Sequence, residues 1–370
     1  MSAFLAEYGL FLLKTLTIVI AIVLVLIAII GAVVRTRRMG GAGGSGEGHI
    51  EISKFNERLE DMQEALSLSL LEPVARKQAE KDKKKSDKAE RKAAKQAAKR
   101  AKKQRGAGET IAPDESKRRV YVMNFDGDLR ASAVDNLRRE ITALLTTATP
   151  EDEVVIRLES GGGMVAPYGL GASQLDRIRQ KKIPLTVCVD KVAASGGYMM
   201  ACVSDKLIAA PFAVLGSIGV VAQIPNFHRL LKELKIDFEL LTAGKFKRTL
   251  TLFGENTDEG RQKFLEDIER IHVQFKQHVG THRSSLDIEK VATGEIWSGQ
   301  DALDLNLADR LATSDEYLVE ACEESEVLLL AYKEKRNLMD RFSFGIEATI
   351  DRVLMRWVDR LMKSRFSIGG

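Results

Sequence analysis

The stretch EVVIRLESGGGMV, residues 153–165, decides the fold, because a short apolar run ends in a glycine-rich turn that a helical pattern follows. Short apolar runs bounded by turn residues are typical of buried strands, and residues 166–178 carry apolar side chains at helical spacing. Strand-like and helical segments continue to alternate on both sides of this stretch. The sequence therefore predicts an α/β domain with helices layered on a largely parallel sheet.

Further strands and helices are expected on either side. The strands are VYVMNF (120–125), IPLTVCVD (183–190), DKLIAAP (205–211) and DFELL (237–241), and the helices are 133–145, 227–234 and 259–279. Ligands of such sheets bind outside the carboxyl ends of the strands. Two glycine-rich turns follow strands at such places, LESGGGMV after Glu159 and ASGGYMM after Asp190.

These two turns can supply backbone N–H donors. Neither has the GxxxxGK[ST] or GxGxxG spacing, which excludes a phosphate loop and dinucleotide binding. Glycine lets the backbone approach a ligand closely, so both turns together can hold an oxyanion. Ser195 stands in the second turn, within DKVAASGGYMMACVSD at 190–205. By itself, this pattern fits a nucleophile and a small residue in a packed turn equally well.

A serine nucleophile needs a base, and the histidines are poorly placed for that role. They are His49 in a glycine-rich tether, His228, and His272, His278 and His282 on the expected water-facing side of a long helix. His278 and His282 have i, i+4 spacing, but no acidic residues accompany them, so we predict no metal site. Lys245 and Lys247, in LLTAGKFKRTLTLF, follow a predicted strand, where burial would leave a lysine neutral. An ordinary solvated loop explains those lysines as well.

The N-terminus predicts a membrane anchor. Residues 15–34, TLTIVIAIVLVLIAIIGAVV, carry no charge and are long enough to cross a hydrocarbon core of roughly 30 Å. RTRR follows this segment instead of a small-residue cleavage site, so we expect it to stay uncleaved. Arg35, Arg37 and Arg38 favour a cytoplasmic location for the chain that follows.

Charge and cysteine content narrow the class of protein. The chain has 370 residues and a net charge of +4, but residues 76–105 hold 15 basic against four acidic side chains, which leaves the remainder at −7. This basic segment lacks aromatic residues, which argues against nucleic-acid binding and favours a solvated spacer, or attraction to anionic membrane lipids. Cys188, Cys202 and Cys322 are odd in number and lie in apolar surroundings, so we expect buried thiols and no disulfide.

Four regions follow from these patterns. The anchor occupies residues 1–39, and a flexible, basic helical spacer occupies 40–116, with one short helix in FNERLEDMQEALSLSLLEP. The α/β domain occupies 117–314. The last region, 315–370, is expected to contain the strand EVLLLAY and an amphipathic helix that packs on a neighbouring subunit or lies on the membrane.

Six segments resemble the signal peptide peptidase A family of serine proteases, in the order found in that family. They are VYVMNFDGDL, ESGGGMV, KVAASGGYMMA, APFAVLGSIGVV, TAGKFKR and ATGEIWSGQDALDLNLAD, spread over 117–311. The anchor and the long basic spacer resemble the SohB branch of the family. Members share the Clp protease and crotonase-like fold, which agrees with the predicted α/β layers.

The resemblance implies a role for each site residue. Ser195 is implied to be the nucleophile and Lys247 its general base, while Ser217, in GSIGV, orients the lysine. The N–H groups of Gly196 and Gly162 are implied to form the oxyanion hole, and no metal or cofactor is needed. The chain has Ser160-Gly161 where the family usually has Ser-Pro, which makes this turn more flexible.

The function implied by the resemblance is that of a membrane-anchored serine endopeptidase of the bacterial inner membrane. Its expected substrates are signal-peptide remnants or unfolded and membrane-protein segments, and its subunits are expected to form a ring with shared sites. The family places the catalytic domain outside the cytoplasmic membrane, whereas the charges beside the span favour the cytoplasm. A crotonase-like acyl-CoA enzyme and a catalytically silent membrane-associated scaffold remain the alternatives.

Overall fold

The computed structural model describes residues 17, 48–72, 74–75, 85, 92 and 118–334. The predicted anchor apart from Thr17, nearly all of the basic segment and the predicted C-terminal helix lie outside these residues. Among the described residues, no helix combines the length and the apolar character needed to cross a bilayer. Residues Ile50–Tyr332 form one compact unit, which contains the predicted catalytic residues.

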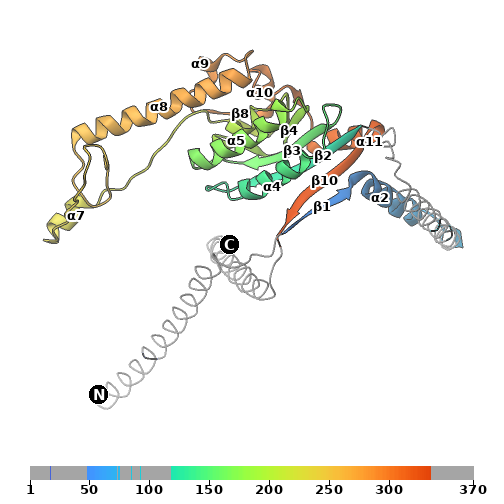
Figure 1. Cartoon of the computed structure of the whole chain (residues 1–370), viewed down its shortest axis with the longest axis horizontal. Helices are drawn as coiled ribbons and strands as arrows, with labels where there is room; N and C mark the ends of the chain where they lie inside the picture. The colour runs from blue at the N-terminus through green and yellow to red at the C-terminus, as the bar shows by residue number, and fades with distance from the viewer. Residues whose placement is uncertain are drawn as a thin grey trace, which may run out of the picture. The chain divides into compact units, whose positions relative to one another are not determined.

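One sheet of ten strands is the centre of this unit in the described part of the chain (Figure 1). The strands are β1 (His49–Lys54), β2 (Arg119–Gly127), β3 (Glu153–Ser160), β4 (Leu185–Val189), β5 (Val192–Ala194), β6 (Lys206–Ala209), β7 (Val214–Gly216), β8 (Ile296–Ser298), β9 (Arg310–Leu311) and β10 (Glu326–Lys333). Their order is β1-β10-β2-β3-β4-β6-β9, and β5 pairs with β3 and β7 to form a branch that ends in β8. The following strand pairs are parallel: β10–β2, β2–β3, β3–β4, β3–β5, β4–β6, β5–β7 and β6–β9. The pair β7–β8 is antiparallel. The predicted α/β fold with a largely parallel sheet is confirmed.

Helices cover both faces of the sheet. They are α2 (Phe55–Ser69), α4 (Val134–Leu144), α5 (Val165–Gln180), α6 (Gly196–Ala201), α7 (His228–Glu233), α8 (Asp258–His282), α9 (Ile288–Val291), α10 (Gly299–Asp304) and α11 (Ser314–Glu324). Because side chains alternate along a strand, Tyr121 and Met123 of β2 pack with α4, α5 and α6, whereas Val120 and Val122 pack with α2 and α11. Strand β2 is therefore buried on both faces, which explains its continuous apolar run.

Most predicted helices and strands are present within a few residues of their expected bounds. The expected helices at 133–145, 166–178 and 259–279 correspond to α4, α5 and α8, and the expected short helix after the tether is α2. Strands β1 and β10 lie outside the range 117–314 expected for the domain, yet both join its sheet, β10 in parallel register with β2. Cys188 and Cys202 are buried and all three cysteines are free, as predicted.

The predicted strand DFELL is wrong. Residues 237–241 have no strand structure and are exposed, because they belong to a segment, 221–257, that leaves the sheet after β7. Backbone groups form a strand only where a partner strand satisfies them, and this segment has none. Figure 1 shows its helix α7 beyond the N-terminal end of α8, away from the sheet.

Candidate active site

The two glycine-rich turns lie side by side, as predicted. Strand β3 leads into the first turn and β5 into the second, and Ser160 pairs with Ala193 in parallel register. A Cβ atom placed on Gly162 would lie 2.7 Å from the Ala194 carbonyl oxygen and equally close to the Ser195 Cβ. The turns are therefore in direct contact at one edge of the sheet.

Ser195 occupies a strained position between β5 and α6. Its backbone has φ 53° and ψ −119°, a conformation that costs a non-glycine residue about 1–3 kcal/mol. The bond from the Ser195 N–H to the Gly216 carbonyl oxygen, 2.8 Å, holds it in place. A sharp turn from strand to helix with a strained serine at its apex is the geometry of a nucleophile elbow, which exposes the hydroxyl at the sheet edge. Ser195 is accordingly only half-buried.

Two glycines must follow Ser195 because their neighbours lie too close for a side chain. A Cβ on Gly196 would lie 2.5 Å from the Tyr168 ring, and one on Gly197 would lie 2.4 Å from the Ser160 carbonyl oxygen. Gly196 is also the first residue of α6, so its N–H has no partner within the helix. This places a backbone donor directly after the serine.

The first turn is held by Ser160, a residue that sequence reasoning did not assign. Its Oγ accepts the Gly162 N–H at 3.1 Å and lies 2.5 Å from the Tyr168 hydroxyl, which donates to the Asp128 carbonyl oxygen. Burial raises the pKa of Tyr168, so the phenol stays neutral. The N–H of Gly162 thus points into its own turn, and a substrate oxygen would have to compete with Ser160 for it.

Ser217 lies close to Ser195, as its predicted role requires. It follows β7 with φ 51° and donates its N–H to the Glu295 carbonyl oxygen at 2.6 Å. Both serines line one surface depression of about 300 Å³, together with Gly219, Val220, Val221, Ile268, Glu269, His272, Thr293 and Gly294.

Lys247 does not line this depression. It is exposed on the segment 221–257, and its N–H bonds to the Gly244 carbonyl oxygen within a local turn. The neighbouring Lys245 pairs with Glu259 at 2.6 Å, and both side chains are largely exposed. Within one chain, the structure therefore brings together every predicted catalytic residue except the base.

His272, which the sequence did not suggest as a site residue, lines the depression. It is half-buried on α8, and its Nε2 lies 3.1 Å from the Ala292 carbonyl oxygen. The expectation that His272, His278 and His282 face water is wrong, because α8 packs along the domain and partly buries all three. Helical spacing alone could show that Glu269 and His272 share a face, but not which surface that face meets.

Comparisons with known proteins show which family the chain is similar to. The model "Peptidase family S49 N-terminal" matches residues 3–175, and the model "Peptidase family S49" matches residues 177–328. The protein called probable protease SohB from Haemophilus influenzae is 48% identical over 356 residues, which cover 95% of this chain and 96% of that protein. Probable protease SohB from Buchnera aphidicola subsp. Acyrthosiphon pisum is 49% identical over 241 residues, covering 65% and 72%.

Among solved structures, a mutant of the 1510-N membrane-bound stomatin-specific protease in complex with a substrate peptide matches with a TM-score of 0.38 and 17% identity. The match covers 62% of this chain and 98% of that one.

Proposed function

Because this chain belongs to peptidase family S49, we propose that it is a serine endopeptidase in which Ser195 is the nucleophile. The observation that carries the proposal is the strained backbone of Ser195 at the apex of a strand-to-helix turn, beside an unpaired helix N–H. Strain of this kind persists only where surrounding packing enforces it, and it clusters at reactive residues. We also propose that the domain has the Clp protease and crotonase-like fold.

The reaction follows from these positions. The Ser195 Oγ attacks the carbonyl carbon of a peptide bond and passes its proton to a base, and the negative charge moves to the carbonyl oxygen. The Gly196 N–H and a donor from the first glycine turn, Gly162, stabilise that oxygen. The base then protonates the leaving amine as the C–N bond breaks, and water releases the acyl group by the same route.

We assign the base to Lys247 of a neighbouring subunit in a ring. Lys247 is not among the residues that line the depression of its own chain, so this assignment requires a second copy to supply it. The segment also exposes many large apolar side chains, and such patches mark protein interfaces. They are Val221, Ile224, Phe227, Leu230, Leu234, Ile236, Phe238, Leu240, Leu241, Phe246, Leu252 and Phe253. Ser217 of the depression would then hydrogen-bond the incoming lysine and orient it.

His272 is the competing base, because it lines the same depression as Ser195. A histidine base would need no second subunit. The two assignments predict different effects of substitution. If Lys247 is the base, its loss stops the reaction; if His272 is the base, the reaction survives the loss of Lys247.

The peptide substrates are proposed to be signal-peptide remnants or unfolded and membrane-protein segments. The uncharged stretch at 15–34 would anchor the enzyme in the bacterial inner membrane, and the arginines after it favour a cytoplasmic Ser195. Neither an acyl-CoA reaction nor a silent scaffold requires a strained, accessible serine, so the site favours the peptidase.

A serine-directed fluorophosphonate probe tests the proposal. The probe should label wild-type protein at Ser195, identified by mass spectrometry of the digested adduct, and Ser195→Ala should not react. The substitution should leave the fold unchanged, since alanine and serine tolerate positive φ similarly poorly, and circular dichroism would verify this. Absence of labelling in folded, wild-type protein would exclude Ser195 as a nucleophile.

A further inference from the structure

Three metal-binding side chains meet between α6 and α8. One ligand atom from each of Cys202, His278 and His282 lies within 4.8 Å of the others. Cys202 caps the C-terminal end of α6 and is buried, while the two histidines stand one turn apart near the end of α8. The two imidazole rings lie 4.5 Å apart between centroids.

Hydrogen bonds leave one nitrogen of each imidazole available. His278 Nε2 lies 2.9 Å from the Met199 carbonyl oxygen, and His282 Nδ1 lies 2.9 Å from the carbonyl oxygen of His278. Only an N–H can bond to a carbonyl oxygen, so His278 Nδ1 and His282 Nε2 carry free lone pairs. Histidines that bind metals typically donate their second N–H to a backbone carbonyl in this way.

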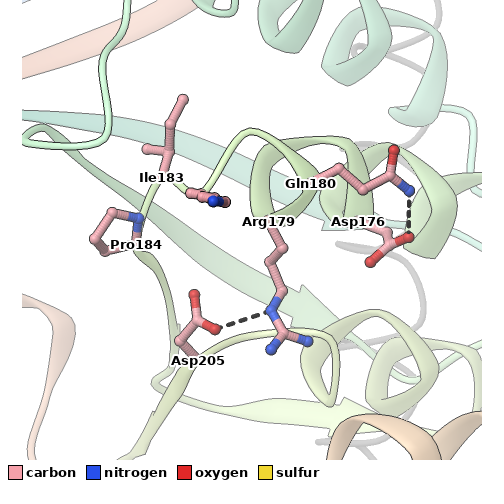
Figure 2. Close-up of a pocket in the computed structure, with 7 residues that line it drawn as sticks. Asp176, Arg179, Gln180, Ile183, Pro184 and Asp205 are labelled. Atoms are coloured by element: carbon pink, nitrogen blue, oxygen red, sulfur yellow. Dashed lines mark hydrogen bonds and ion pairs between the residues drawn. The ribbon is translucent and has the colours of Figure 1, made fainter.

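A carboxylate lies beside His282, at the edge of the cluster. Asp176 Oδ1, from α5, lies 3.7 Å from His282 Nε2. The other carboxylate oxygen of Asp176 accepts a hydrogen bond from Gln180 at 2.8 Å, as Figure 2 shows, and this bond leaves Oδ1 available. Asp176 also lines a solvent-open pocket, and its side chain is 38% exposed, which gives an ion a path to the cluster.

We propose that Cys202, His278, His282 and Asp176 bind one Zn²⁺ ion. One sulfur, two nitrogens and one carboxylate oxygen are the ligands that a four-coordinate zinc site uses. Tetrahedral zinc places its nitrogen and sulfur ligands roughly 3.3–3.6 Å apart, so Cys202, His278 and His282, now within 4.8 Å of one another, need to close by about 1 Å. Asp176, now 3.7 Å from His282 Nε2, has to turn toward the other two ligands. The proposal departs from the prediction of no metal site, which was based on the lack of acidic residues near the histidines in the sequence. Asp176 stands on a different helix, α5, and is remote in sequence from His278 and His282.

The ion would fasten α8 to α5 and α6. The same α8 presents Glu269 and His272 to the depression that contains Ser195, so the metal would hold one wall of that depression in position. The proposed role of the ion is structural, because its ligands contact one another and do not include Ser195. The inference does not depend on which residue acts as the base.

Titration of the purified, untagged full chain with Zn²⁺ and Co²⁺ tests the site. We expect one equivalent of Zn²⁺ to bind by isothermal titration calorimetry and to raise the melting temperature by an amount that grows with the logarithm of its concentration relative to Kd. Co²⁺ should give the visible absorption of a tetrahedral complex and a thiolate-to-cobalt charge-transfer band in the near ultraviolet. That band reports the cysteine ligand independently of enzymatic activity.

Substitutions assign the ligands. Cys202→Ser should abolish the charge-transfer band, and His282→Gln, at a less buried position, should weaken Zn²⁺ binding at least tenfold. Cys322→Ser, which removes a thiol on α11, should bind as the wild type does. Circular dichroism identifies any variant that fails to fold. Failure of the folded wild type to bind Zn²⁺ would overturn the proposal. So would binding of Zn²⁺ by the folded His282→Gln and Cys202→Ser variants that is as tight as binding by the wild type.

Discussion

Gly162 and Gly196 approach so closely that a Cβ atom on Gly162 would lie 2.7 Å from the backbone nitrogen of Gly196. The two residues follow different strands, and each stands in one of the two glycine-rich turns. Their proximity brings two backbone segments to the hydroxyl of Ser195 without any intervening side chain. The glycines are thus required by the site and cannot be replaced by other small residues.

The first prediction concerns this approach. Gly162→Ala should lower kcat/KM for a peptide substrate by about 10²–10³-fold, the cost of displacing one oxyanion donor, and should also destabilise the domain by about 1–3 kcal/mol. The new Cβ would clash with the second turn, and φ at this position is +87°. Gly161→Ala is the matched control, because its Cβ would meet no atom within 4 Å. Thermal melts should show a stability of Gly161→Ala within about 0.5 kcal/mol of that of the wild type. An equal loss of stability and activity in both variants would contradict the proposed role of Gly162.

The second prediction concerns the base. Lys247→Ala should abolish peptide hydrolysis, whereas Lys245→Ala should be mild, since it breaks an exposed ion pair with Glu259 and a contact with the neighbouring Phe246 ring. His272→Gln is the third variant in the comparison. Activity that survives Lys247→Ala but disappears in His272→Gln would transfer the role to the histidine.

The third prediction tests whether subunits share sites. Ser195→Ala and Lys247→Ala chains, each inactive alone, should recover activity when co-expressed. Random pairing around a ring leaves about one quarter of the interfaces with an intact serine and an intact lysine. Mixed assemblies are purified through two different tags and assayed for peptide hydrolysis. If verified mixed assemblies stay inactive, serine and lysine must act within one chain.

A fourth prediction concerns stability and pH. Asp152 accepts hydrogen bonds from Arg119 Nε and Nη2 at 3.0 and 2.9 Å and from the Thr149 backbone at 2.8 Å, and its side chain is 4% exposed. Burial tends to raise the pKa of Asp152, but these hydrogen bonds outweigh it and hold the pKa below the ordinary value of 3.8. Asp152→Asn should therefore lower the free energy of unfolding by roughly 1–3 kcal/mol at neutral pH.

The sign of the pH dependence follows from this shift. A lowered pKa means that the unfolded chain binds the proton more readily, so the contribution of Asp152 is complete above about pH 3.8 and is lost as the pH falls through its folded pKa. Urea unfolding followed by circular dichroism should show the difference between wild type and Asp152→Asn shrinking in acid. Asp135→Asn is the control, because Asp135 is 77% exposed and its 3.5 Å pair with Arg138 contributes little.

The fifth prediction concerns the side of the membrane. A reporter that is active only after export should be silent when fused behind Gly370, because Arg35, Arg37 and Arg38 are expected to keep the following chain in the cytoplasm. Substitution of all three arginines by glutamine should increase the exported fraction. A strong reporter signal from the unmodified chain would instead support the outer location implied by the family resemblance.

Local patterns in the sequence were sufficient to predict most of the layered fold. Buried parallel strands read as continuous apolar runs, so EVVIRLE and VYVMNF identify β3 and β2 without knowledge of their partners. Helices α4, α5 and α8 show their spacing within a single segment in the same way. The turn at Ser195 was also visible, because a serine followed by two glycines signals close packing wherever it lies.

Only the tertiary structure decided which of these segments meet. DFELL has a strand-like composition, but it lies where no strand can pair with it, and Lys247 stands on the same protruding segment, away from Ser195. His272 reaches the depression with Ser195, and Cys202, His278, His282 and Asp176 gather from α5, α6 and α8. Composition and spacing describe one segment at a time, whereas a site depends on which helix face packs against which strand end. That choice depends on burial summed over the whole domain, which no short segment contains.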